Sequence, residues 1–582
     1  MFILGISCFY HNSAAVLLKD GKLLAAAEEE RFTRVKYDSS FPEKAIEFCL
    51  DYAGIKSKDL SYVGFYEKPF LKFERLLQTY LSYAPKGLSS FLEAMPVWAK
   101  EKLWIKSIIQ QKLNGKFDII FVPHHLSHAA SSFFVSPFEK AAILTMDGVG
   151  EWQTTTWGYG ENNKIYLSQE INFPHSLGLL YSAFTYYCGF KVDSGEYKLM
   201  GLAPNGQPKY VQKIYKNLID VKDDGSFALN MDYFTYEYSL KMIGQKFEKL
   251  FGKPALSPET LPHPQFYCDI AASIQKVTEE VILKMVNNIY QKTQLENLCL
   301  AGGVALNCVA NGRLLKEGPF KNIFIQPAAG DAGGALGTAF YIYNSLLNHK
   351  RVFKMESSYW GPEFLDKEIG KFLAKGKISA EHFRSEKLLL KNVAGLLREQ
   401  KIIGCFQGRM EWGPRALGNR SILADPRGAQ MKDIINAKIK HREPFRPFAP
   451  IIMEDRMKDY FEIAGPTPFM LFTAQINHRQ KGKVPAITHV DNSARIQSVN
   501  VHQNKFLYNL LVQFKGLTGC PLLVNTSFNI RGEPIVCTPE DAYNCFMGTD
   551  MDYLILGKYL LDKSKMKMTS KHREFKKSFD LD

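Results

Sequence analysis

Two distant stretches of the chain repeat one order of strands and turns, and this repeat limits the fold more than any other feature. Residues 2–31 read as an apolar strand, a polar turn, a second strand, an Asp-Gly turn and a third strand. Residues 141–173 again give an apolar strand ending in Asp-Gly, a second strand, an Asn-Asn turn and a third strand. An internal duplication of this kind predicts two similar α/β lobes that face one cleft.

The chain is too long for one ordinary domain at 582 residues. The polar stretch NHKRVFKMESS, residues 348–358, separates the duplicated part from a region where helices and short strands begin again. We therefore expect a first domain over 1–353, a second, mixed α/β domain over 354–562, and a basic tail over 563–582. Residues 73–113 carry Leu, Phe and Trp at helical spacing, which predicts helices that either cover the cleft as a lid or simply pack on a lobe.

Composition indicates an ordinary globular protein, with 46% apolar and 23% charged residues and no apolar run long enough for a membrane span. The opening MFILGIS reads as a strand without a cleavable leader, so we expect a cytoplasmic location. Ten cysteines without a CxxC spacing predict reduced, buried thiols. The formal net charge of +14 favours anionic partners, either nucleic acid or small anions.

The stretch VPHHLSHAA places His124 and His128 four residues apart, so both imidazoles share one face of a helix and can bind one metal. A zinc peptidase of the H-E-x-x-H type is excluded, since His125 stands where its glutamate would be. Asp147 at the end of a strand and Asp331 in the tight turn PAAGDAGG are the carboxylates best placed to complete a set of nitrogen and oxygen ligands. Such a set suits Fe(II), Mn(II) or Zn(II). The alternative is a pair of core histidines with no metal.

Two glycine-rich turns lie near the end of the first domain. Residues 298–315 and 323–343 each read as a strand, a turn rich in glycine and a helix. Turns of this type let backbone N–H groups come close to a phosphate or an adenosine.

Long ordered motifs along residues 5–557 resemble the carbamoyltransferase family, which includes enzymes that carbamoylate nodulation factors and antibiotics. Besides the histidine and aspartate positions above, the motifs are GEYKLMGLAP, AGGVALNCVANGRL, AAGDAGGALG, GRMEWGPRALGNRSILADPR, HREPFRPFAP and NTSFNIRGEPIV. The resemblance implies an α/β protein with a duplicated actin-like ATPase domain, similar to the threonylcarbamoyl transferase subunit, followed by a YrdC-like domain.

The resemblance also implies two reactions. In the C-terminal domain, carbamoyl phosphate and ATP, with Mg²⁺, give carbamoyl-adenylate and pyrophosphate. In the N-terminal domain, a metal, Fe(II) by resemblance, assists transfer of the carbamoyl group to a hydroxyl of a small natural product or sugar-like acceptor. The metal ligands it implies are those already suggested by spacing, and His11 is our choice for the base that accepts the hydroxyl proton.

Cations crowd the C-terminal motifs, as a site for carbamoyl phosphate and a triphosphate requires. They are Arg415, Arg420, Lys440, Arg442, Arg446 and Arg495. By motif position the resemblance assigns donor and nucleotide contacts to Arg415, Arg420, Lys440, Arg446, Arg495, Asn525 and Ser527. In the N-terminal domain it suggests nucleotide contacts at Gly302, Gly303, Asn307 and Asn311. Glu196 and Lys198 are further residues that could assist transfer or bind the acceptor.

Two other functions compete with an O-carbamoyltransferase. A tRNA-modifying threonylcarbamoyl enzyme would use the same two folds, but the chain lacks a Lys/Arg stripe interleaved with aromatics, so no nucleic-acid partner is expected. A non-enzymatic actin-like switch that binds a protein would need neither the histidine pair nor the second domain's arginines. We expect no membrane partner, and a homodimer is the default assembly.

Overall fold

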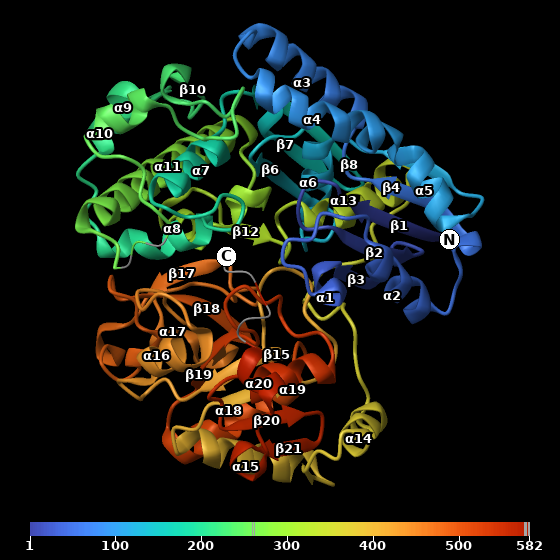
Figure 1. The fold of residues 1–582 in the computed structure, drawn as a ribbon, viewed down its shortest axis with the longest axis vertical. Helices are drawn as coiled ribbons and strands as arrows, with labels where there is room; N and C mark the ends of the chain where they lie inside the picture. Colours follow the sequence, from blue (N-terminus) through green and yellow to red (C-terminus); the bar gives the residue numbers. More distant parts are fainter. Residues whose placement is uncertain (259, 261, 576–578, 580–582) are drawn as a thin grey trace. The chain divides into compact units, whose positions relative to one another are not determined.

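The structure is a computed structural model that divides into two compact units (Figure 1). It describes the chain except for residues 259, 261, 576–578 and 580–582. The first unit holds Met1–Glu29 and Tyr37–Met355, and the second holds Glu30–Lys36 and Glu356–Asp582. The predicted basic tail contains the short helix α20, Ser570–Glu574, and part of this tail lies outside the described residues.

The first sheet of the N-terminal unit has the order β3-β2-β1-β4-β5. Its strands are β1 (Phe2–Ser7), β2 (Ala14–Lys19), β3 (Lys22–Glu28), β4 (Leu60–Phe65) and β5 (Asp118–Phe121). The first three strands are antiparallel neighbours, whereas β4 runs parallel to β1 and β5 runs parallel to β4. The two parallel steps require crossovers, and the chain between β4 and β5 forms helices.

The second sheet of this unit repeats that topology strand for strand. Its order is β8-β7-β6-β11-β12, and its strands are β6 (Lys140–Met146), β7 (Gln153–Glu161), β8 (Lys164–Asn172), β11 (Asn297–Ala301) and β12 (Asn322–Ile325). Again three antiparallel strands are followed by two parallel ones. The predicted duplication of an α/β lobe is therefore confirmed.

Two helices fill the space between the two sheets. Helix α13 (Ala332–Tyr341) packs on β1, β2 and β4, while α6 (His124–Phe133) packs on β6, β7 and β11, and the two helices pack on each other. Gly337 of α13 makes this contact close, because a Cβ atom there would lie 1.8 Å from the carbonyl oxygen of Ser127. The order of layers is sheet, helix, helix, sheet, as in Figure 1.

The helices predicted over residues 73–113 are present. They are α3 (Pro69–Tyr83), α4 (Leu88–Lys100) and α5 (Ile105–Leu113), joined by short turns. Helix α5 buries Ile105, Ile109 and Leu113 in the usual amphipathic way. Helix α3 differs, because its buried side chains include two cations.

The C-terminal unit is built on one nine-stranded mixed sheet of order β13-β21-β20-β14-β15-β19-β16-β18-β17. The strands are β13 (Glu381–His382), β14 (Ile403–Phe406), β15 (Arg420–Ala424), β16 (Ala449–Met453), β17 (Phe472–Gln475), β18 (Ser493–Val499), β19 (Leu522–Ser527), β20 (Tyr553–Leu556) and β21 (Tyr559–Asp562). Helices α15 (Glu386–Arg398) and α18 (Lys505–Thr518) pack together in this unit. The predicted mixed α/β class is confirmed, and the YrdC-like fold stays a prediction.

A segment from the first lobe of the sequence belongs to this second unit, which the sequence did not indicate. Residues Glu30–Lys36, including the short helix α1 (Glu30–Thr33), follow directly after β3. Arg34 has a φ of 61° and its guanidinium lies 2.8 Å from Glu533 Oε1. It also donates to the carbonyl oxygens of Pro534 at 2.8 Å and Ile535 at 2.7 Å.

The cysteine prediction is confirmed, since all ten thiols are free and buried. Within the described part of the chain, no helix combines the length and apolar character that a bilayer span needs.

Replacing Gly337 with alanine should destabilise the first unit by about 1–3 kcal/mol, because the new methyl group overlaps the backbone of α6. Denaturant unfolding followed by circular dichroism measures this change. Gly395→Ala on α15 is the matched control, since a Cβ atom there meets nothing within 4 Å and alanine favours a helix. Equal unfolding midpoints for both variants would contradict the close helix contact.

Replacing Arg34 with methionine should destabilise the second unit by about 3 kcal/mol, because Glu533, only 1% exposed, loses its ionic partner. Hydrogen exchange of the peptide covering 528–536 should accelerate, since its carbonyl groups lose their donor. Lys481→Met, at an exposed position of the same unit, should leave this exchange unchanged. Normal protection of 528–536 in Arg34→Met would show that the segment Glu30–Lys36 does not support this loop.

Candidate functional site

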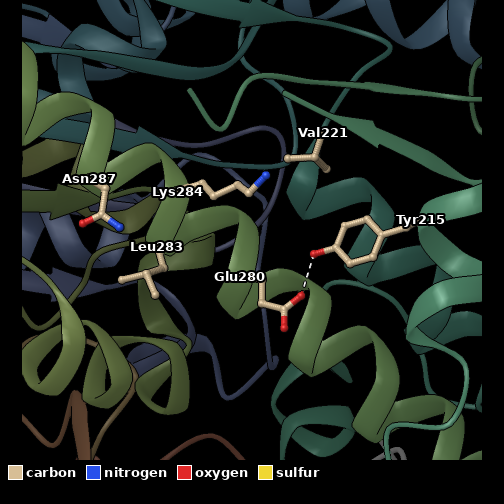
Figure 2. Close-up of a pocket in the computed structure, with 6 residues that line it drawn as sticks. All are labelled: Tyr215, Val221, Glu280, Leu283, Lys284 and Asn287. Carbon is tan, nitrogen blue, oxygen red and sulfur yellow. Dashed lines mark hydrogen bonds between the residues drawn. The ribbon is translucent and has the colours of Figure 1, made fainter. Parts of the chain in front are cut away.

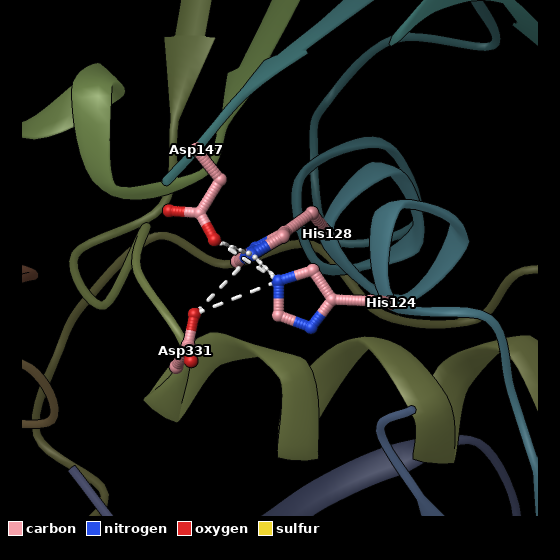
Figure 3. A group of neighbouring side chains, drawn as sticks. All are labelled: His124, His128, Asp147 and Asp331. Atoms are coloured by element: carbon pink, nitrogen blue, oxygen red, sulfur yellow. Dashed lines mark hydrogen bonds and ion pairs between the residues drawn. The ribbon is translucent and has the colours of Figure 1, made fainter. Parts of the chain in front are cut away.

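Four predicted metal ligands meet at one point in the N-terminal unit (Figure 3). His124 and His128 lie on the first turns of α6, and Asp147 follows directly after β6. Asp331 is the N-cap residue of α13. The packing of α6 on α13 therefore brings the ligands from distant parts of the chain together.

The ligand atoms of the four residues all lie within 4.8 Å of one another. The Nε2 atoms of His124 and His128 are 3.1 Å apart. Asp147 Oδ2 lies 3.0 Å from His124 Nε2 and 3.5 Å from His128 Nε2. Asp331 Oδ1 lies 3.7 Å and 3.6 Å from the same two nitrogens.

This geometry suits one divalent ion. Nitrogen and oxygen ligands bound at about 2.1 Å to the same ion are separated by roughly 3 Å, as the two imidazole nitrogens are. Asp331 Oδ1 is buried and has no hydrogen-bond partner among the described residues, so a cation would satisfy it. The donor set of two imidazoles and two carboxylates is one that Fe(II), Mn(II) and Zn(II) accept.

Neighbouring groups hold the ligands in position. Asp147 Oδ1 accepts a hydrogen bond from the backbone N–H of Gly303 at 2.8 Å, which leaves Oδ2 directed toward the histidines. Glu151 accepts from the backbone N–H of His124 with both carboxylate oxygens at 3.0 Å. Gly302 needs its φ of 90°, and a Cβ atom there would lie 2.1 Å from the Met146 carbonyl oxygen. The glycine-rich turn thus supports the candidate metal ligands.

The opposite charges within the cluster shift the pKa values of its members. Burial opposes the charged imidazolium, but the carboxylates of Asp147 and Asp331 outweigh it and raise the pKa of His128 to about 9. Burial would raise the pKa of Asp147, yet the imidazoles of His124 and His128 hold this pKa well below its ordinary value. A metal ion would take the place of the protons that these contacts now stabilise.

His11 lies in the loop after β1, at the edge of the cluster. Its Nε2 is 3.6 Å from Asp331 Oδ2, and its Nδ1 is 2.8 Å from Asn12 Oδ1. Burial lowers the pKa of His11, but Asp331, Asp193 and Asn12 outweigh this effect and raise it. With Nδ1 donating to Asn12, Nε2 is the nitrogen available to take a proton at the cluster.

The other residues predicted in the N-terminal domain have identifiable structural contacts. Asn307 caps helix α12 (Cys308–Glu317) by accepting from Ala310 N, and it exchanges two hydrogen bonds with Gln275. Asn311 donates to the Ala305 carbonyl oxygen at 2.7 Å. Their contacts to a nucleotide stay predictions.

Glu196 and Lys198 lie on helix α8 (Glu196–Leu202). Glu196 accepts from the hydroxyl of Ser182 at 2.7 Å, and burial raises its pKa. Lys198 is buried. A role for either residue with the acceptor stays a prediction.

In the C-terminal unit, Lys440 is the most constrained of the predicted residues. Its buried Nζ lies within 2.6–3.1 Å of four oxygens, which belong to the carbonyl and side chain of Ser527 and of Asn529. Burial, helped by the charges of Arg442 and Arg446, lowers the pKa of Lys440 well below its ordinary value. Lys440 and Ser527 therefore lie in one cluster, and their contacts with carbamoyl phosphate or ATP stay predictions.

Arg420 and Asn525 lie on the neighbouring strands β15 and β19 and are both buried. The guanidinium of Arg420 stacks on Phe406 at 3.7 Å and donates to four backbone carbonyls, including that of Gln407 at 2.6 Å. In this structure it holds the turn after β14. Asn525 donates to Gln497 at 2.7 Å, while its Oδ1 is buried without a hydrogen-bond partner among the described residues.

The remaining predicted cations are Arg415, Arg446 and Arg495. Arg446 lies 3.7 Å from Glu443, and Arg495 is part of β18 opposite Thr473 of β17. Arg415 lies in the loop between β14 and β15. Their contacts with carbamoyl phosphate or ATP stay predictions.

Three acidic or amide residues with structural roles at these sites were not predicted from the sequence. Glu151 supports His124, and Asn529 holds Lys440. Glu411 accepts the backbone N–H groups of Leu417, Asn419 and Arg420 with one oxygen. A signal was present for Glu151 and Asn529, since each follows a recognised motif residue within four positions.

A separate pocket lies against helix α11 (Gln265–Thr293) in the N-terminal unit (Figure 2). It is lined by Tyr215, Val221, Glu280, Leu283, Lys284 and Asn287. The Tyr215 hydroxyl donates to Glu280 at 2.8 Å, so these two polar groups of the pocket are hydrogen-bonded to each other. None of the predicted site residues lines this pocket.

Comparison with protein families decides the identity of the chain. Residues 2–340 match the family described as Carbamoyltransferase N-terminus, and residues 394–563 match Carbamoyltransferase C-terminus. The chain belongs to the carbamoyltransferase family. It is a carbamoyltransferase enzyme. The N-terminal match contains the His124 cluster, and the C-terminal match contains the Lys440 cluster.

Among relatives, this carbamoyltransferase is 53% identical to Uncharacterized protein sll1178 of Synechocystis, with both chains covered completely. It is 36% identical to Nodulation protein NolNO of Sinorhizobium fredii, over 95% of this chain and 79% of that protein. Among solved structures, component A of (R)-2-hydroxyglutaryl-CoA dehydratase from Acidaminococcus fermentans matches with 15% identity over 60% of this chain and 100% of that chain. The TM-score of 0.34 is too low to show a common fold.

Replacing Asp331 with asparagine should weaken binding of a divalent metal by roughly 100-fold or more, because one anionic ligand is lost from the cluster. Metal content after dialysis, measured by inductively coupled plasma mass spectrometry, tests this. His125→Gln is the matched control, since His125 Nδ1 lies 2.7 Å from Thr145 Oγ1 and outside the four-ligand set. Equal metal content in the two variants would contradict the assigned ligands.

Proposed function

We propose that this carbamoyltransferase is an ATP-dependent O-carbamoyltransferase with two active sites. In the C-terminal unit, carbamoyl phosphate is hydrolysed to carbamate and phosphate. The carbamate oxygen then attacks the α-phosphorus of ATP, which forms carbamoyl-adenylate and releases pyrophosphate. In the N-terminal unit, a hydroxyl of a small natural product or sugar-like acceptor attacks the carbamoyl carbon, and AMP leaves.

The observation that carries this proposal is the buried cluster of His124, His128, Asp147 and Asp331 with His11 at its edge. A divalent ion at this cluster, Fe(II) by family resemblance, would supply Lewis-acid polarisation of the carbamoyl carbonyl. His11 Nε2 is the group that would accept the proton of the acceptor hydroxyl, because Nδ1 is engaged with Asn12. The backbone N–H of Gly303 fixes Asp147 and so orients the cluster.

The Lys440 cluster supports the activating half of the proposal. Burial is the main cause that lowers the pKa of Lys440, and the nearby positive charges of Arg442 and Arg446 lower it further. Phosphate oxygens would relieve this repulsion, and a triphosphate with its Mg²⁺ needs several such cations. The buried Oδ1 of Asn525 has no hydrogen-bond partner among the described residues, and it is an acceptor that the adenine amine or the carbamoyl NH₂ could satisfy.

The two half-reactions should be separable by mutation. Lys440→Met should reduce pyrophosphate release from ATP and carbamoyl phosphate, without acceptor, by at least about 100-fold, because the ammonium group that holds Ser527 and Asn529 in the cationic cluster is lost. Asp331→Asn should keep this release within about twofold of the wild type, since it changes the other unit. Pyrophosphate release in a coupled phosphatase assay is the measurement.

Lys438→Met is the matched control, because Lys438 is exposed two positions before Lys440. It should release pyrophosphate at the wild-type rate. Release that does not depend on carbamoyl phosphate, or that survives Lys440→Met, would overturn the activating reaction. Once release is established, small hydroxylated compounds are screened for acceptor-dependent AMP formation, which Asp331→Asn should abolish.

A further inference from the structure

Helix α3 is oriented against the usual rule for an amphipathic helix. It buries the cations Lys72 and Arg75, which lie three residues apart and so on one face, while Phe70 is 71% exposed and Leu81 is 75% exposed. Charged side chains are rarely buried without a partner. The contacts of the two cations therefore require an explanation.

Helix α3 is tied to the metal cluster at its start. The backbone N–H of Lys68, the N-cap residue, donates to Glu151 Oε1 at 2.7 Å. The same carboxylate accepts the backbone N–H of His124, so one side chain joins α3 to the first metal ligand. Lys72 and Arg75 therefore lie on a helix whose position is set by the cluster.

Lys72 has an anionic partner and an aromatic one. Its Nζ lies 2.6 Å from Glu67 Oε2 and 4.3 Å from the ring centroid of Tyr10. The Tyr10 ring is in turn 5.3 Å from that of His11, the proposed base. Lys72 thus borders the loop that carries His11, but its charge is already neutralised.

Arg75 is different. Its side chain is buried, its Nε has no hydrogen-bond partner among the described residues, and its guanidinium rests on the ring of Phe173 at 4.8 Å. The two carboxylates whose charges act on it are engaged elsewhere, Glu67 with Lys72 and Glu151 with backbone N–H groups. Within the described part of the chain no ion pair or hydrogen bond to its guanidinium occurs.

A buried guanidinium without an anion destabilises a fold, whereas its planar set of donors matches the two oxygens of a phosphate or carboxylate. We propose that Arg75 is an oxyanion-binding residue that receives a phosphate or carboxylate group of a substrate beside the His11 loop. The carboxylate of Glu67 does not require the charge of Arg75, since Glu67 is already paired with Lys72.

As a substrate subsite this proposal rests on the function proposed above, and two sources of the oxyanion are compatible with it. One is the phosphate of the adenylate. The other is an anionic group on the acceptor, which would make the enzyme selective for acidic acceptors. Both use the same guanidinium, so the experiment first tests binding and then separates the sources.

The first test needs no turnover. Crystals of the full chain soaked in selenate should show an anomalous peak at the Arg75 guanidinium that is lost in Arg75→Met. The variant should also unfold about 1–3 °C higher than the wild type without ligand, because an apolar side chain replaces an unpaired buried charge. Lys100→Met, at an exposed position on α4, is the control and should change neither result.

The outcomes separate as follows. Displacement of selenate by AMP, with AMP binding at least tenfold weaker in Arg75→Met, assigns the site to the nucleotide. Selenate that AMP does not displace assigns it to an acidic acceptor. The proposal would be overturned if a wild-type crystal held selenate at other cationic sites but showed no peak at Arg75. It would also be overturned if Arg75→Met unfolded at a clearly lower temperature than the wild type, since that marks a purely structural role. Neither result depends on whether pyrophosphate is released, so failure here is distinct from failure of the proposed reaction.

Discussion

The close packing of α6 on α13 is the contact on which the N-terminal site depends. Gly337 lets the two helices approach until there is no room for a Cβ atom, and candidate metal ligands lie at the start of each helix. Because each helix packs on its own sheet, the duplicated lobes place two distant segments of sequence at one point. Asp147 at the end of β6 then completes a cluster that neither lobe could form alone.

The second site depends on a comparable long-range connection. Arg34 pairs with Glu533, whose carboxylate accepts the backbone N–H of Ile530 and whose carbonyl accepts from Asn529. Asn529 in turn holds Lys440 with two of its oxygens. A short segment that follows β3 in the sequence thus supports the principal cation of the C-terminal unit. Cutting the chain between the two domains in sequence would leave this unit without Arg34.

Much of the candidate site could be predicted because its chemistry is carried by local patterns. The spacing of His124 and His128 requires only one turn of helix, Asp147 directly follows an apolar strand, and Asp331 lies in a glycine-rich turn before a helix. The supporting groups were harder to find. Glu151 and Asn529 act through backbone N–H groups and a lysine whose positions depend on packing, so the motif residues beside them did not by themselves reveal these roles.

The sequence by itself determined the duplicated lobe and the mixed α/β second domain and singled out four candidate metal ligands, because strand periodicity, turn residues and helical spacing are local properties. Only the tertiary structure decided that Glu30–Lys36 joins the second unit and that α3 turns its cations inward. Helical spacing alone would have buried Phe70 and Leu81. Three tertiary contacts instead fix the orientation in which α3 buries its cations. They are the hydrogen bond from Lys68 N–H to Glu151, the ion pair of Lys72 with Glu67 and the contact of Arg75 with Phe173, and they join residues 5 to about 100 positions apart.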